Sequence, residues 1–225
     1  RMAKIKMPKG TPTIDMTPMV DLAFLLVTFF MLAANFRSNE PVDVNIPSSI
    51  GDEEVPEKTL ILVTVDKGGR LFFNVTGDST VRRSVISQMA TKYNAPLNSD
   101  HLKEYLKITS IGCSMAELPA YLSTDGEGRK NFKTLGIPAD STNNQLKDWI
   151  NYANLAMLQY GKDAYLKAKD EAKPNEVVKP EDFKPKFVLK VEGQAEYVRA
   201  KMAIETFRDL NLNNLHFVTS LENKQ

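Results

Sequence analysis

The feature that most constrains this chain is an apolar run near its N-terminus, TPMVDLAFLLVTFFMLAANF, at residues 17–36. The hydrocarbon core of a bilayer is about 30 Å thick and needs about 20 apolar residues in a helix. This run supplies 20 residues. Thr17 and Pro18 are typical of a helix start, because threonine caps a helix and proline is tolerated at its first position. The sequence therefore predicts one transmembrane helix over residues 17–36.

The charges on the two sides of this run differ in sign. Residues 1–16 carry four basic side chains and one acid, whereas acids dominate the stretch that follows Arg37. Because basic segments stay on the cytoplasmic side, residues 1–16 are expected to form a cytoplasmic arm, with everything after the helix across the membrane. A cleaved signal peptide has a similar pattern. Leu32 is bulky where the cleavage motif prefers a small residue, which favours a retained anchor.

Asp21 lies inside the apolar run. A helix that began after it would have only residues 22–36, about 22 Å of rise, so the helix is expected to include Asp21. An ionised side chain near the centre of a membrane helix costs about 2.5–3.5 kcal/mol, and such residues usually mark a proton or ion path. The alternative is an interfacial carboxylate that snorkels to water. Thr28 lies on nearly the same helical face, either as a helper of the proton path or bonded back to the carbonyl of Phe24.

The composition changes to proline, glycine and acids in residues 37–58. This change predicts an extended tether that follows the helix on the far side of the membrane. Within it, Val42, Val44 and Ile46 alternate with polar residues, as in a short strand. From the residues alone, this stretch is either a plain spacer or a strand that pairs with a partner.

The rest of the chain alternates between strand and helix patterns. Strands are expected at 59–65, 71–75, 187–191 and 215–219, with helices at 80–93 and 197–210. The order ββα…βαβ predicts a two-layer α+β domain over residues 59–93 and 187–225, with its helices on one face of the sheet. In the second helix, Val198, Met202 and Phe207 are expected to lie roughly on one side.

Residues 94–186 interrupt this domain. A long amphipathic helix is expected at 145–172, with shorter helices near 102–106 and 115–122 and a proline-rich connector after them. The apolar stripe of the long helix consists of Leu146, Trp149, Ile150, Ala153, Met157 and Tyr160. It is expected to pack against the shorter helices as a mostly helical insertion beside the domain. A docking face for a partner or a second copy is the alternative.

Residue patterns for chemistry are sparse. The net charge of +1 gives no reason to expect binding to nucleic acid. One cysteine, Cys113, and two histidines, His101 and His216, offer neither a disulfide nor metal-ligand spacing. Phosphate-binding and hydrolase motifs are absent from the sequence. We therefore expect no catalytic residue, no metal and no cofactor, with His101 on the surface and His216 structural.

The stretch IDMTPMVDLAFLLVTFFML, followed by VDVNIPSS, resembles the ExbD/TolR family, whose members are single-span subunits of proton-driven motors in the bacterial inner membrane. The resemblance covers residues 1–78 and 186–222. It implies that Asp21 is the proton-carrying aspartate and that the tether strand binds a partner. That strand consists of Val42, Asp43, Val44, Asn45, Ile46 and Pro47. The compact family domain lacks the segment 94–186.

The resemblance also implies partners and a function. The chain is expected to form a dimer whose two helices stand inside a pentamer of an ExbB/TolQ-type subunit. The proton motive force would then act on a TonB- or TolA-type protein that spans the periplasm. A membrane-anchored periplasmic binding or scaffold module remains as an alternative, as does a Tol-type motor that maintains the envelope. A peptidoglycan-bound stator is weaker, because the C-terminal part has no recognisable peptidoglycan-binding motif.

Overall fold

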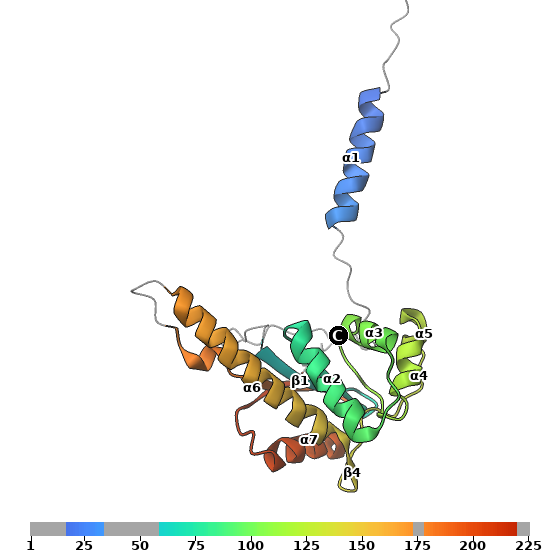
Figure 1. The fold of residues 1–225 in the computed structure, drawn as a ribbon. Helices are drawn as coiled ribbons and strands as arrows, with labels where there is room; N and C mark the ends of the chain where they lie inside the picture. Colours follow the sequence, from blue (N-terminus) through green and yellow to red (C-terminus); the bar gives the residue numbers. More distant parts are fainter. Residues whose placement is uncertain (1–16, 34–58, 173–177, 220–225) are drawn as a thin grey trace, which may run out of the picture. The chain divides into compact units, whose positions relative to one another are not determined.

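The computed structural model describes residues 17–33, 59–172 and 178–219 (Figure 1). The chain divides into two compact units, Arg1–Arg37 and Ser38–Gln225. The first unit contributes one described helix, α1 (Thr17–Ala33), with 17 residues. Among the described residues, no helix combines the length and the apolar composition that a membrane crossing requires. Residues 34–36 of the expected span lie outside the described residues.

The second unit is built on a four-stranded mixed sheet in the order β2-β1-β5-β6. Its strands are β1 (Leu60–Val65), β2 (Leu71–Val75), β5 (Lys186–Val191) and β6 (Leu215–Thr219). β1 pairs antiparallel with β2, whereas β1 with β5 and β5 with β6 pair in parallel. A parallel neighbour requires a long crossover, so residues 76–185 all lie between the second strand and the third. The expected order ββα…βαβ is observed.

Local residues explain how the first elements begin and end. The Asp66 carboxylate closes the β1–β2 turn by accepting the Arg70 backbone N–H at 2.8 Å, and Gly69 supplies a φ of +72°. Asp78 caps α2 (Ser79–Tyr93) by accepting the N–H of Thr80, and Asn94 ends this helix in the left-handed conformation. These polar residues fix the boundaries, whereas the apolar pattern fixes which face is buried.

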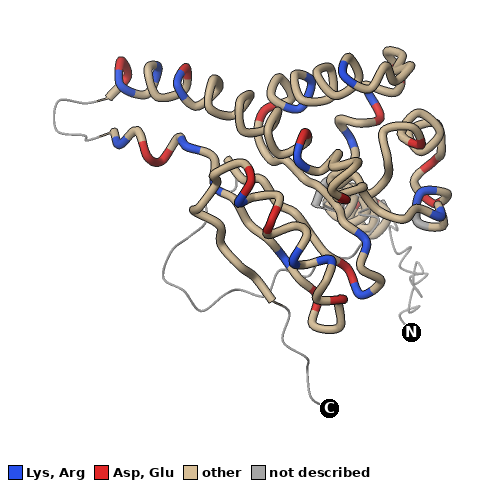
Figure 2. Tube along the Cα trace, turned by 90° about the horizontal axis from the view of Figure 1, so that it is seen from below, with Lys and Arg blue, Asp and Glu red and all other residues tan. Residues whose placement is uncertain are grey.

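The crossover between β2 and β5 is mostly helical. It contains α3 (Ser99–Lys107), α4 (Leu118–Ser123), α5 (Gly126–Lys130), a small hairpin of β3 (Ala139–Asp140) and β4 (Asn143–Asn144), and the long helix α6 (Gln145–Glu171). A 3₁₀ turn, η2 (Pro180–Phe183), follows in the connector and contacts α6. Figure 2 shows acidic and basic residues interspersed along the helices, with no broad region of one sign in the described chain.

The apolar stripe of α6 is buried from Leu146 to Met157, whereas Tyr160 is 37% exposed. Its partners are more numerous than expected. α6 packs mainly along α2, and Figure 1 shows the two helices side by side. The ring of Trp149 lies 5.4 Å from that of Phe73 on β2 and 6.4 Å from that of Tyr105 on α3, between centroids. The stripe therefore belongs to the same core as the sheet. The expected contact with the shorter helices is present at Tyr105, but the insertion is not a satellite beside the domain, because the stripe also packs on α2 and the strands.

The last helix, α7 (Tyr197–Asp209), also packs on the sheet, and its expected stripe is confirmed at Phe207 but wrong at Val198. Ala200, Ala203 and Phe207 are buried, whereas Val198 is 58% exposed. The buried residues follow the helical spacing i, i+3, i+7, which places Val198 outside the contact face. The small side chains at Ala200 and Ala203 let the helix approach the strands closely.

Replacing Trp149 with alanine tests whether α6 is part of the domain core. Trp149 is fully buried, so Trp149→Ala should lower the free energy of unfolding of the full chain by about 3–5 kcal/mol. Leu155→Ala on the exposed side of α6 is the control, with an expected change within about 0.5 kcal/mol. Urea unfolding followed by far-UV circular dichroism measures both, because the chain has no other tryptophan to report by fluorescence. Equal stability of the two variants would contradict this assignment.

A second prediction concerns Cys113, which is buried in the same core. Burial, with a smaller contribution from the Glu117 carboxylate, raises the pKa of its thiol to about 12. The thiolate is the reactive form, so the native chain should resist iodoacetamide at about pH 8 and react after unfolding in urea. Mass spectrometry of the alkylated protein measures this. Rapid labelling of the native chain would mean that the core around Cys113 opens.

Candidate functional site

Asp21 lies in the second turn of α1, on a helix whose other described side chains are almost all apolar. From Pro18 to Met31 every residue of this helix is exposed. Leu25 and Thr28 follow Asp21 at spacings of four and seven residues, so the three share one face. The helix thus presents a single carboxylate on an otherwise apolar and uncovered surface.

Thr28 bonds back to its own helix. Its hydroxyl lies 2.9 Å from the carbonyl oxygen of Phe24 and 3.0 Å from that of Leu25. The hydroxyl hydrogen is therefore shared between backbone acceptors, while the lone pairs of Oγ1 remain able to accept a bond. Seven residues correspond to about 10 Å along the axis, so a bond between Asp21 and Thr28 needs an intervening water.

The tether residues named above, Val42, Asp43, Val44, Asn45, Ile46 and Pro47, lie outside the described residues. The structure therefore neither places them nor brings them to Asp21.

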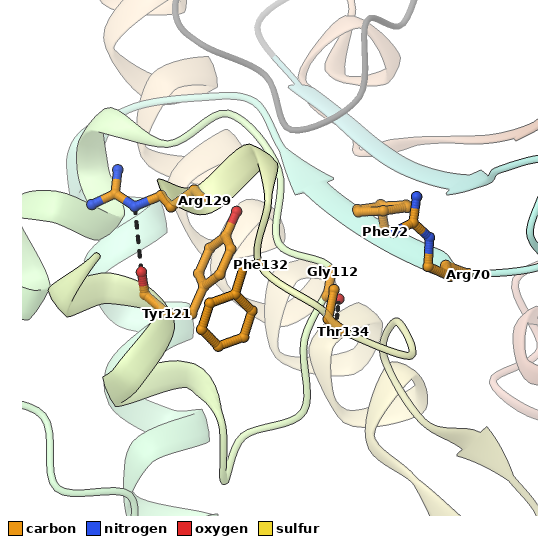
Figure 3. A pocket seen from close by; sticks show the side chains of 7 residues that line it. All are labelled: Arg70, Phe72, Gly112, Tyr121, Arg129, Phe132 and Thr134. Atoms are coloured by element: carbon orange, nitrogen blue, oxygen red, sulfur yellow. Dashed lines mark hydrogen bonds between the residues drawn. The ribbon is translucent and has the colours of Figure 1, made fainter. Parts of the chain in front are cut away.

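A small pocket lies where the crossover meets the start of β2 (Figure 3). Its volume is about 30 Å³, and its lining is aromatic and basic: Arg70, Phe72, Gly112, Tyr121, Arg129, Phe132 and Thr134. A site needs about 10–15 Å³ to hold a water, so this pocket suits one or two water molecules. No local sequence pattern predicted this pocket, since its residues come from five separate segments.

Two polar groups define the chemistry of this pocket. The Tyr121 hydroxyl is buried without a hydrogen-bond partner among the described atoms, and burial raises the pKa of this phenol to about 12. Arg129 donates from Nη2 to the Glu104 carboxylate at 2.8 Å and to the Leu122 carbonyl at 3.2 Å. The pKa of Glu104 is lowered below its usual range, and the largest contribution comes from the hydrogen bond that Arg129 donates. Both cations, Arg70 and Arg129, are thus already paired with acids.

His101 and Ser123 form a contact that the sequence did not suggest. The His101 Nε2 lies 2.9 Å from Ser123 Oγ, while its Nδ1 accepts the Asn98 backbone N–H at 3.4 Å. An imidazole that accepts at Nδ1 carries its proton on Nε2, so it donates to Ser123 and is not a base for that hydroxyl. The pair links α3 to α4. Among the described residues no group of acidic, histidine and cysteine side chains could hold a metal ion.

Replacing Tyr121 with phenylalanine tests what the pocket holds. If the hydroxyl has no partner, Tyr121→Phe should leave the free energy of unfolding unchanged or slightly raised, because a buried unpaired hydroxyl costs about 1–3 kcal/mol. Tyr93→Phe is the control, since the Tyr93 hydroxyl donates to Asp148 at 2.6 Å, and its loss should be destabilising. Urea unfolding measures both. Marked destabilisation by Tyr121→Phe would reveal a water bonded to the hydroxyl.

A protein family matches almost the whole chain. The family described as biopolymer transport protein ExbD/TolR matches residues 7–222. This range includes Asp21, the tether and the crossover between β2 and β5. No curated protein and no solved structure matches the chain. The chain belongs to the ExbD/TolR family of biopolymer transport proteins.

Proposed function

We propose that this chain is a subunit of an inner-membrane proton-channel motor of the ExbB–ExbD or TolQ–TolR type. In this proposal the motor couples the proton motive force to a TonB-type protein that spans the periplasm and serves outer-membrane transport. The observation that carries the proposal is Asp21 on the apolar helix α1, within a chain whose family is that of biopolymer transport proteins. The family supports a transport component without enzymatic activity, and ExbD-type and TolR-type roles both remain compatible with it.

The exposed surface of α1 supports the membrane part of this proposal. A helix that is apolar on all sides is stable only where lipid or protein covers it. We infer that residues 17–36 form a single span, with the basic arm at residues 1–16 in the cytoplasm and the α+β unit in the periplasm. The proposed cover is a pentamer of an ExbB/TolQ-type subunit around the helices of two copies of this chain.

Asp21 would act by changing its protonation state as its surroundings alternate. A carboxylate that leaves water favours its neutral form, and one that meets water or a cation favours its charged form. Movement of the helix between two such environments would take up a proton on one side of the membrane and release it on the other. Thr28 would assist as an acceptor for a water, since its own hydrogen is engaged by Phe24 and Leu25.

The tether would transmit the motion. We propose that residues 42–47, Val42 to Pro47, pair with the TonB- or TolA-type partner as an added strand, in which backbone bonds give affinity and alternate side chains give specificity. If the helix served only as an anchor for a periplasmic scaffold, Asp21 would have no role. The behaviour of Asp21 therefore separates the motor from the scaffold.

Replacing Asp21 with asparagine is the direct test. Asp21→Asn is nearly isosteric, so the chain should still copurify with its membrane partners, while energy-dependent outer-membrane transport falls to background. Asp21→Glu should retain part of the activity, because it keeps the carboxylate. Thr28→Val should have a milder effect than Asp21→Asn. Normal transport by Asp21→Asn at normal complex yield would exclude the proton-carrying role and favour the scaffold.

A further inference from the structure

The C-terminal end of α6 extends beyond the core of the second unit. The last buried residue of this helix is Gly161, and residues 162–171 are all exposed or half-buried. We call residues 162–171 the arm and residues 178–185, which contain η2, the strap. Figure 1 and Figure 2 both show the strap beside the arm, and α6 contacts η2. The arm therefore has the strap as a neighbour at the end of α6 that the core does not bury.

The arm meets the strap along one narrow face. Its half-buried residues Ala164, Tyr165 and Ala168 follow Gly161 at spacings of three, four and seven residues, so they share one side of the helix. The rings of Tyr165 and Phe183 meet edge to face, with 5.9 Å between their centroids. Among the described residues, no hydrogen bond or salt bridge joins the arm to the strap. This contact therefore depends on packing alone.

Gly161 determines how closely the strap approaches α6. A methyl group at this position would overlap the carbonyl oxygen of Phe183 and lie 3.2 Å from its carbonyl carbon. Glycine in a helix interior costs about 1 kcal/mol relative to alanine, so local helix stability does not explain its presence here. The backbone of the strap occupies the space that a larger residue at position 161 would need.

We propose that the arm and the strap form a latch, which opens and closes as one local unit while the rest of the domain stays folded. Helices shorter than about 12–15 residues are marginal in water without tertiary packing. Because the arm has no buried residue of its own, loss of the strap removes its packing and the helix frays back to Gly161. β5 stays in place, since it pairs with β1 on one side and with β6 on the other.

Opening of the latch changes the crossover without unfolding the sheet. With the latch closed, the strap is fixed against α6 immediately before β5 begins at Lys186. With the latch open, the strap is released from α6 and the rings of Tyr165 and Phe183 become accessible. The latch is a conformational device of the crossover, and it does not rest on the proposed motor function.

Hydrogen exchange of the full chain tests whether the arm is a separate unit. Amides of residues 164–171 should exchange through a local opening that mild urea barely changes, whereas those of residues 146–157 should follow global unfolding. In the strap, the amides of Asp182 and Lys184 donate to the carbonyls of Lys179 and Glu181 and report its state. Mass spectrometry with residue resolution measures all three groups. Equal exchange rates and equal urea dependence for residues 164–171 and 146–157 would overturn the proposal.

Gly161→Ala is the sharper test, because two effects have opposite signs. Helix propensity alone predicts slower exchange in the arm. Overlap with Phe183 instead predicts that exchange of the arm and of the two strap amides rises about tenfold, while β1 and β5 are unchanged. Phe183→Ala should give the same result, because it removes the ring contact with Tyr165.

Leu166→Ala is the matched control on the exposed side of the arm, where the side chain is 57% exposed. It should leave exchange within about twofold of the unaltered chain. Unchanged or slower exchange of the arm in Gly161→Ala would overturn the latch. A rise in the arm without the strap amides, or an equal rise in β1 and β5, would overturn it as well.

Discussion

The packing of α6 on α2 and the strands holds the second unit together. A two-layer domain with only α2 and α7 would leave bare part of the sheet face that carries Ile61, Val63 and Phe73. The stripe around Trp149 covers that part. The helix lies between β4 and the connector in sequence, yet its side chains reach Phe73 on β2 and Tyr105 on α3. The long crossover is therefore part of the domain's core as well as an addition to its surface.

The two units pose opposite solvation problems. The second unit buries its apolar residues and places charges of both signs around them (Figure 2). In α1, by contrast, the apolar side chains are exposed and one carboxylate stands among them. In the proposed membrane span, an acid on such a helix would be costly when charged. A proton-driven motor needs a group of this kind, whereas a simple anchor does not.

Several features of the chain could be predicted because they depend on neighbouring residues. The hairpin of the first two strands, the helix predicted over 80–93 and the long helix predicted over 145–172 follow from turn and periodic patterns. The stripe of α7 was predicted wrongly at Val198, because several residues had compatible spacing and only the sheet selected Ala200, Ala203 and Phe207. The pocket of Tyr121 and Arg129 and the His101–Ser123 contact had no local signal.

The sequence by itself determined the order of strands and helices, the place of Asp21 within an apolar helix, and the alternating pattern of the tether, since periodicity and charge are properties of consecutive residues. Only the tertiary structure decided that the Trp149 stripe joins the sheet core, and that the Tyr121 hydroxyl is buried with no hydrogen-bond partner among the described atoms. These outcomes depend on which surfaces meet across more than a hundred residues of crossover. Periodicity states that a face must be buried, but competition among all the apolar surfaces of the chain selects its partner.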